Sequence, residues 1–363
     1  MKKKLLINSI KLKKFKKPLV CLTAYTTPMA EILDKYCDVI LVGDSLGMVL
    51  HGMKSTREVT LDMMIMHGKA VRRGVNKSLL VVDMPIGTYE KTPKIALKNA
   101  TKILKETNCD AVKVEGGMKV YKTIKYLVDN NIQVMGHVGL LPQSVKKKSD
   151  YRVKGKDYLS FNQIIKDSIS IEKAGAFSVV VECVVKDLAD KISQRIKIPT
   201  IGIGASNKCD GQILVTEDIL GFSEKPPKFV KMYDNFKERT EICVKKFVKD
   251  LKNNNFPNIK NMYRVLLFRT IKLSINNPKM GAQLTALGLA FMLVIQAFIN
   301  MAVAVSLFPT TGQPLPLESM GGTSTLFTCL ALGIILSICR SKDEQEEDLS
   351  LTKTKFMEPV PTV

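Results

Sequence analysis

Four carboxylates in this chain each stand at the C-terminal end of a short apolar run. They are Asp44, Asp83, Glu115 and Glu182. The runs are apolar almost throughout, which is typical of parallel strands that are buried on both faces. Parallel strands end on one face of a sheet, so we expect the four carboxylates to converge. Clustered carboxylates repel one another, and a bound cation or a raised pKa relieves the repulsion. The pattern therefore predicts a metal-assisted acid/base site.

Each of these residues also has a purely structural interpretation. A single acid after a buried strand is typical of a helix N-cap or a turn residue. Asp83 precedes a Met-Pro pair and is compatible with simple strand termination, and Lys113 is compatible with a barrel-interior lysine paired with Glu115. His137 ends another apolar run, where a hydrogen-bonded scaffold role and a substrate-side role both remain open.

Strand and helix patterns alternate along the part of the chain that carries these residues. We expect strands at 18–23, 38–43, 78–83, 110–115, 132–138, 177–182 and 198–203, with an eighth near 213–215. We expect helices near 60–73, 93–107, 117–130, 161–175 and 186–195, and one capped by Thr27 with Pro28 in its first turn. The alternation predicts an α/β protein with a parallel sheet, and the count favours a closed (β/α)₈ barrel, the TIM-barrel architecture, with its active site on the C-terminal face.

Composition narrows the class of protein. The chain has 55 basic and 34 acidic residues. Residues 263–363 contain only 8 of the basic and 7 of the acidic residues, so nearly all the excess positive charge belongs to residues 1–262. The lysines are scattered and no nucleic-acid motif accompanies them, so we expect no nucleic-acid partner. None of the eight cysteines forms a C-x-x-C pair, and only three apolar residues follow the basic start, which predicts a reduced, cytoplasmic domain. Residues 139–160 are expected to form a long basic loop.

Several motifs over residues 1 to about 260 resemble those of the ketopantoate hydroxymethyltransferase family. The motifs are Leu41–Met48, Asp110–Gly117, Gly136–Leu140 with Pro142–Ser144, Val181–Cys183, and Ile201–Ala205 with Cys209–Gln212. The resemblance implies a (β/α)₈ enzyme of pantothenate synthesis. Its reaction would move a hydroxymethyl group from 5,10-methylenetetrahydrofolate to 3-methyl-2-oxobutanoate and give 2-dehydropantoate. It also implies a homo-oligomer.

The same resemblance assigns roles to individual residues. Asp44, Asp83 and Glu115 would be associated with Mg²⁺, which prefers carboxylate, water and substrate oxygens. Glu182 would be the general base, a role that requires a raised pKa near neutral pH. The 2-oxo acid substrate would be held by Asp44, Ser45, Asp83, Lys113 and His137.

The character of the chain changes after residue 257. Two apolar runs, 284–305 and 323–339, predict a transmembrane hairpin with both ends in the cytoplasm, and the acidic residues that follow predict a disordered tail over 343–363. This region resembles the last two membrane helices of the cell-division and rod-shape peptidoglycan glycosyltransferases. The motifs concerned are Gln296–Asn300, Pro309–Gly312, Leu315–Leu317 and Gly321–Ser324.

The sequence thus predicts a barrel domain over 1–262 and a two-helix membrane fragment over 263–342. Two origins for the fragment stay open, a joined reading frame and a genuine fusion that tethers the barrel to the inner membrane. Two other functions also stay open. One is a different metal-dependent aldolase or lyase acting on 2-oxo acids, and the other is a non-catalytic membrane or cell-wall assembly protein that acts through the hairpin.

Overall fold

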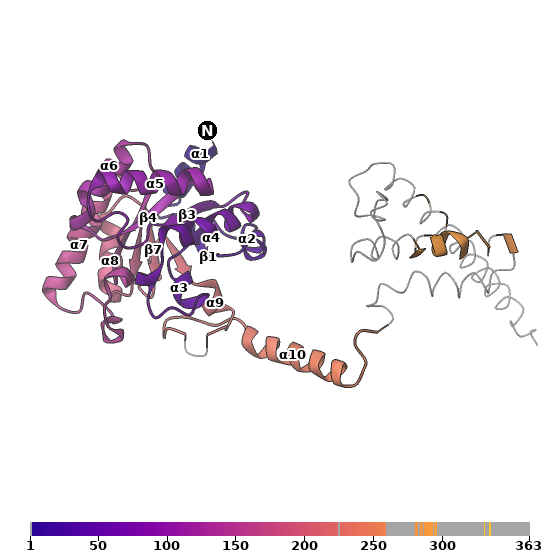
Figure 1. Ribbon diagram of the computed structural model, residues 1–363. Helices are drawn as coiled ribbons and strands as arrows, with labels where there is room; N and C mark the ends of the chain where they lie inside the picture. Colours follow the sequence, from indigo (N-terminus) through magenta and orange to yellow (C-terminus); the bar gives the residue numbers. More distant parts are fainter. Residues whose placement is uncertain are drawn as a thin grey trace, which may run out of the picture. The chain divides into compact units, whose positions relative to one another are not determined.

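The computed structural model describes residues 2–223 and 226–258, together with scattered helical positions between 280 and 334. Eight parallel strands close into a barrel in sequence order (Figure 1). Their bounds are β1 Leu19–Thr23, β2 Val39–Val42, β3 Leu79–Asp83, β4 Ala111–Glu115, β5 Val134–Gly139, β6 Ser178–Glu182, β7 Thr200–Ile203 and β8 Gly211–Leu214. The predicted (β/α)₈ barrel is therefore confirmed, including its eighth strand.

Helices surround this barrel, apart from the one at Phe236–Lys252, which has no buried residue. Their bounds are α1 Lys2–Leu12, α2 Thr27–Leu33, α3 Leu46–Val49, α4 Leu61–Gly74, α5 Pro93–Thr107, α6 Tyr121–Asp129, α7 Tyr158–Lys173, α8 Lys186–Arg195, α9 Thr216–Ile219 and α10 Phe236–Lys252. Side-chain caps begin several of them: Thr60 accepts a hydrogen bond from the Met63 backbone N–H and Thr92 from that of Ile95. Thr27 is not a cap, because helix α2 already includes it and its hydroxyl donates to the Ala70 carbonyl at 2.8 Å.

Two apolar clusters hold the barrel together. One lies between the strands and the helix layer, and the other fills the barrel interior with alternate strand residues such as Val39, Leu79 and Met135. Helix α1 adds Ile7 and Ile10 to the interior cluster, and Lys14 after it pairs with Asp210 at 2.7 Å. Helix α1, which was not predicted from the sequence, thus covers the N-terminal end of the barrel.

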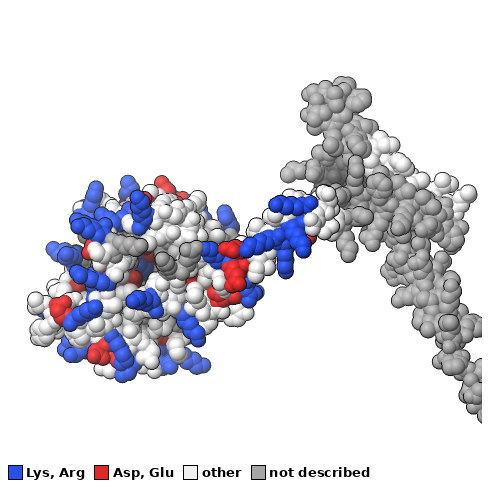
Figure 2. All heavy atoms as spheres, turned by 90° about the horizontal axis from the view of Figure 1, so that it is seen from below, with Lys and Arg blue, Asp and Glu red and all other residues white. Residues whose placement is uncertain are grey.

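Most of the described cysteines are buried, as the apolar sequence around them predicts. Cys21, Cys37 and Cys109 lie in the core, whereas Cys243 is exposed on α10. Lysine and arginine side chains are spread over the face of the barrel that Figure 2 shows. This distribution agrees with the scattered lysines of the sequence.

The C-terminal part of the chain is described only in pieces. Contacts divide the chain into two units, Met1–Glu241 and Ile242–Val363. None of the helices in the described part of the chain is both long enough and apolar enough to cross a bilayer. Of the predicted span 284–305, the structure describes residues 284–285, 287–292 and 294–295, all as helix. Of 323–339 it describes only residues 330 and 334, and the predicted tail 343–363 lies outside the described residues entirely.

Candidate active site

Five consecutive strands, β2 to β6, each bring one ionisable side chain to the C-terminal face of the barrel. The side chains are Asp44, Asp83, Glu115, His137 and Glu182. The first four belong to residues that are at most 5% exposed, whereas the Glu182 side chain is 16% exposed. The predicted convergence of the carboxylates is therefore observed, and Glu182 is the acid with the most access to a bound molecule.

Asp44 and Asp83 are joined through the backbone. The Asp44 N–H donates to Asp83 Oδ2 at 3.1 Å. Residue 43 must be small here, since a Cβ on Gly43 would lie 3.0 Å from Ser45 Oγ and 3.6 Å from Asp83 Oδ2. Burial, followed by the charges of Asp83 and Glu115, raises the pKa of Asp44 well above its usual range.

Lys113 extends from β4 between the acids. Its Nζ lies 3.0 Å from Asp83 Oδ1 and 3.4 Å from His137 Nδ1. Burial lowers the pKa of Lys113, but the surrounding carboxylates outweigh burial, so that the pKa ends above its ordinary value. Lys113 therefore places a permanent positive charge at the bottom of the site.

His137 lies between two carboxylates from the neighbouring strands. Its Nδ1 is 3.4 Å from Glu115 Oε1 and its Nε2 is 3.1 Å from Glu182 Oε2. Burial and the charge of Lys113 lower the pKa of His137. Glu115 and Glu182 raise it by more, so the pKa ends above its usual value, at about 9. A protonated imidazole carries an N–H on both nitrogens. Nε2 makes no hydrogen bond of good geometry among the described residues, but at ion-pair distance the positive charge of His137 can still orient Glu182 and balance part of its charge.

Gln143 connects the loop after β5 to the acids, a role that sequence reasoning missed. Its Nε2 donates to Asp44 Oδ2 at 2.8 Å, and its backbone N–H donates to Glu115 Oε2 at 3.2 Å. The Tyr89 hydroxyl donates to Gln143 Oε1 at 2.6 Å, and Arg57 donates to the Gln143 carbonyl at 2.6 Å. Gln143 stands in the Pro142–Ser144 motif, but nothing in the motif itself shows these long-range partners.

Ser45 lies on the same face but outside this charged network. Its hydroxyl is 2.8 Å from the hydroxyl of Tyr25, a fully buried residue from the loop after β1. Ser45 follows Asp44 directly in the chain, and the structure shows Tyr25 as the partner of its hydroxyl.

The acids have the chemistry that a hard cation needs. Asp83 Oδ1 and Glu115 Oε1 are buried and lack a hydrogen bond of good geometry among the described residues, although Lys113 and His137 lie at ion-pair distance. No three acidic, histidine or cysteine side chains in the described ranges are arranged closely enough to enclose a metal ion by themselves. Mg²⁺ commonly takes only one or two protein carboxylates and completes its shell with water and substrate oxygens, so the residues fit such an ion.

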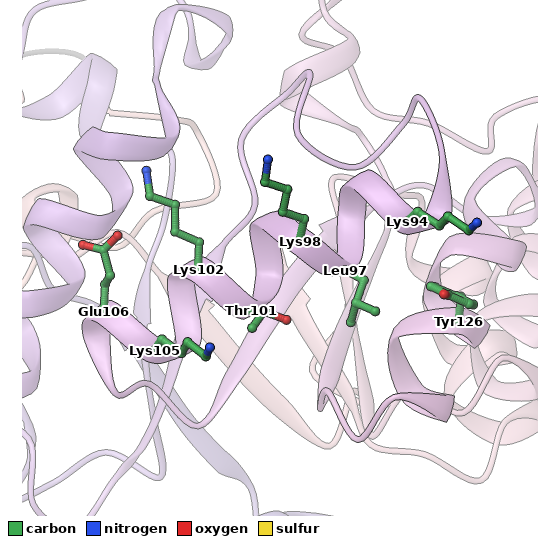
Figure 3. A pocket seen from close by; sticks show the side chains of 8 residues that line it. All are labelled: Lys94, Leu97, Lys98, Thr101, Lys102, Lys105, Glu106 and Tyr126. Carbon is green, nitrogen blue, oxygen red and sulfur yellow. The ribbon is translucent and has the colours of Figure 1, made fainter.

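A groove among the described residues lies elsewhere on the barrel. It has a volume of about 540 Å³ and is lined mainly by α5 residues, four of them lysines, with Tyr126 from α6 (Figure 3). Two of the lining residues already have partners, because Lys102 pairs with Asp62 and Glu106 with Lys69. The groove contains none of the strand-end residues, so it is separate from the candidate active site.

A (β/α)₈ barrel that gathers buried acids, a charged lysine and a histidine at its C-terminal face has the arrangement of an enzyme active site. Residues 4–259 match the family described as ketopantoate hydroxymethyltransferase. The chain belongs to this family, as its motifs predicted.

Curated relatives agree with this assignment. A protein of Maricaulis maris is 48% identical over 254 residues, which cover 70% of this chain and 91% of the relative. A protein of Chelativorans sp. is 53% identical over 245 residues, covering 67% and 87% of the two chains. Both relatives are named 3-methyl-2-oxobutanoate hydroxymethyltransferase.

Two further similarities were found. A crystal structure of phosphonopyruvate hydrolase is 12% identical, with a TM-score of 0.48, and the match covers 77% of this chain and 100% of the other. Residues 259–344 match a second family, described as cell cycle protein. The predicted resemblance of the C-terminal region to cell-division proteins is thereby confirmed at the level of sequence.

Proposed function

We propose that the barrel transfers a hydroxymethyl group from 5,10-methylenetetrahydrofolate to 3-methyl-2-oxobutanoate and releases 2-dehydropantoate, a step of pantothenate synthesis. The observation that carries this proposal is the partly open carboxylate of Glu182 held 3.1 Å from the buried His137, beside the charged Lys113. An acid in that position suits removal of a proton next to a carbonyl group. The names of the relatives support the choice of substrate.

The site would hold Mg²⁺ through one or two of the three carboxylates Asp44, Asp83 and Glu115, with water and substrate oxygens as the other ligands. The ion would supply electrophilic stabilisation for negative charge on the 2-oxo oxygen. Lys113 lies beside Asp83 and attracts the carboxylate of the 2-oxo acid, while Ser45 offers it a hydroxyl.

Water first breaks the two carbon–nitrogen bonds of the folate methylene group: its oxygen stays on the carbon as formaldehyde, its two protons go to the two folate nitrogens, and tetrahydrofolate is released. Glu182 takes the proton from C3 of the substrate, and the resulting carbon nucleophile attacks the formaldehyde carbon. A new carbon–carbon bond forms, the carbonyl π bond breaks, and the oxygen takes the proton from Glu182 to become the hydroxyl group. During this sequence His137 keeps Glu182 oriented and stays protonated, since its pKa is raised to about 9. The neighbouring Gln143 holds Asp44 and Glu115 in place.

The direct test is formation of 2-dehydropantoate by the purified protein with Mg²⁺ and both substrates. Glu182→Gln should lower kcat by at least ~100-fold, because the general base is lost. Glu31→Gln, an exposed change on α2, is the matched control and should retain full activity.

Two outcomes would contradict the proposal. Turnover of the 2-oxo acid that is indifferent to folate would point instead to a metal-dependent aldolase or lyase. Unchanged activity in Glu182→Gln would remove Glu182 from the role of base.

A further inference from the structure

Glu217 is an acid on the C-terminal face that the chemistry above does not use. It lies in α9, directly after β8, where it is partly buried. Its Oε2 atom is fully buried and has no hydrogen-bond partner among the described residues. An unpaired buried carboxylate oxygen destabilises a fold, so its presence calls for a ligand that it can bind.

Short contacts fix Glu217 beside the mouth of the barrel. The preceding Thr216 donates through its backbone N–H to Thr23 Oγ1 at 3.1 Å and through its hydroxyl to the Thr23 carbonyl. These bonds attach α9 to the end of β1. Glu217 also lies near Tyr25, the partner of Ser45. Burial is the main cause that raises the pKa of the Tyr25 hydroxyl, and the charge of Glu217 is the second.

The order of the strands places Glu217 apart from the other acids. In a closed ring of eight strands β8 lies opposite β4, which carries Lys113 and Glu115. The 2-oxo acid is an anion and belongs beside Lys113. A carboxylate on the opposite side would repel that anion, so the group that meets Glu217 must present hydrogen-bond donors instead.

We propose that Glu217 binds the donor edge of the pterin ring of the folate co-substrate. This inference rests on the proposed function. The 2-amino-4-oxo ring of a reduced pterin carries a ring N–H beside an exocyclic amino group. A carboxylate accepts such donors in short, charge-assisted hydrogen bonds, and two parallel donors can pair with its two oxygens. Glu217 is partly exposed, so a turn of its side chain would bring the buried Oε2 to the donor edge as well. The folate would then occupy the β8 and β1 side of the mouth, with its methylene carbon facing the substrate.

The neighbouring Asp218 is a carboxylate with a structural role, and its hydrogen bonding can be compared with that of Glu217. Asp218 is also buried, but its Oδ1 accepts a hydrogen bond from the Ser223 hydroxyl at 3.1 Å. Asp210 similarly accepts from Lys14 and Thr200. Glu217 differs from both because one of its oxygens is left for an incoming donor.

The experiment compares Glu217→Gln with Asp218→Asn in the full-length chain. Gln keeps the size of Glu but turns one acceptor into a donor, which would face the pterin donors. We expect the KM for 5,10-methylenetetrahydrofolate to rise at least ~10-fold in Glu217→Gln, while the KM for 3-methyl-2-oxobutanoate changes less than ~2-fold. Glu217→Asp, which keeps the charge, should recover part of the folate affinity, and Asp218→Asn should leave both constants unchanged.

Direct titration with tetrahydrofolate separates this inference from the proposed function. If the wild-type chain forms no 2-dehydropantoate but binds tetrahydrofolate at least ~10-fold more tightly than Glu217→Gln does, the reaction is wrong and the inference stands. The inference is overturned if both proteins bind tetrahydrofolate equally. It is also overturned if the KM values for the two substrates rise together or if Asp218→Asn has the same effect.

Discussion

His137 is buried between Glu115 and Glu182, and its protonation depends on the balance of their charges against burial and Lys113. Replacement of the imidazole would leave Glu182 without the donor that orients it. We therefore expect His137→Gln to lower kcat by about 10- to 100-fold, as loss of a supporting hydrogen bond commonly does, with the KM for the 2-oxo acid changed less than ~3-fold. His51→Gln, a change at an exposed histidine, is the control. Steady-state kinetics that show an unchanged kcat would contradict a positioning role for His137.

Glu217 links stability to pH. Burial raises its pKa from 4.5 to about 7, and the ionisable groups around it are Tyr25 and Asp218. Below pH 4.5 the carboxyl is protonated in both folded and unfolded chains. Between pH 4.5 and 7 the unfolded chain ionises first, so the folded state loses stability as pH rises, and above pH 7 the loss is constant.

Glu217→Gln should therefore stabilise the protein at pH 8 by about 1–3 kcal/mol and have little effect at pH 4, whereas Glu31→Gln should do neither. Thermal unfolding at the two pH values tests this. If Glu217 binds a ligand, the Glu217→Gln variant should be more stable than the wild-type protein at pH 8 and should bind folate less tightly. Destabilisation at pH 8 would mean that Glu217 has a structural partner instead.

The loop between β5 and α7 is attached to the site through Gln143, which is only 2% exposed. Gln143→Ala would leave the Asp44 carboxylate, the Met84 carbonyl and the Tyr89 hydroxyl without their partner. We expect a loss of roughly 2–3 kcal/mol in stability and a fall in kcat/KM, because the loop would no longer hold the acids. Gln163→Ala, an exposed change on α7, should cost less than ~0.5 kcal/mol. Urea unfolding and steady-state kinetics measure both effects.

The sequence predicted well those elements whose residue pattern lies within one short stretch of the chain. Buried strands read as continuous apolar runs, and their terminal acids mark the C-terminal face, so the barrel and the meeting of Asp44, Asp83, Glu115 and Glu182 were predictable. Helix α1 was missed because lysines dominate it, although the spacing of Ile7 and Ile10 was a usable signal.

The contacts of Gln143 and Glu217 could not be predicted in the same way. Gln143 meets Asp44 across 99 positions of sequence, and such a contact leaves no periodic pattern. Glu217 stands in a Thr-Glu-Asp sequence that is typical of a helix start, where acids are expected for local reasons. Only the closed barrel shows that its oxygen is buried without a partner.

At the scale of the whole molecule, the enzyme and the C-terminal region are predicted to be separable. Nearly all the residues of the two apolar core clusters precede residue 214, and every candidate site residue lies between residues 25 and 217. Among the described contacts of the site, the furthest along the chain joins the Phe222 backbone N–H to the Glu217 carbonyl at 3.0 Å, well before residue 262. A chain that ends at residue 262 should thus keep kcat/KM within ~2-fold of the full-length protein, as expected for independent parts.

The same pair of proteins tests membrane attachment. The predicted span 284–305 would be about 33 Å long as a helix, enough to cross a hydrocarbon core of about 30 Å, whereas 323–339 would reach only about 25 Å. If this region tethers the barrel, the full-length protein should sediment with membranes, and the chain that ends at residue 262 should stay in the supernatant. A full-length protein in the supernatant would contradict the tether, while a shortened chain without activity would show that the barrel needs its C-terminal region.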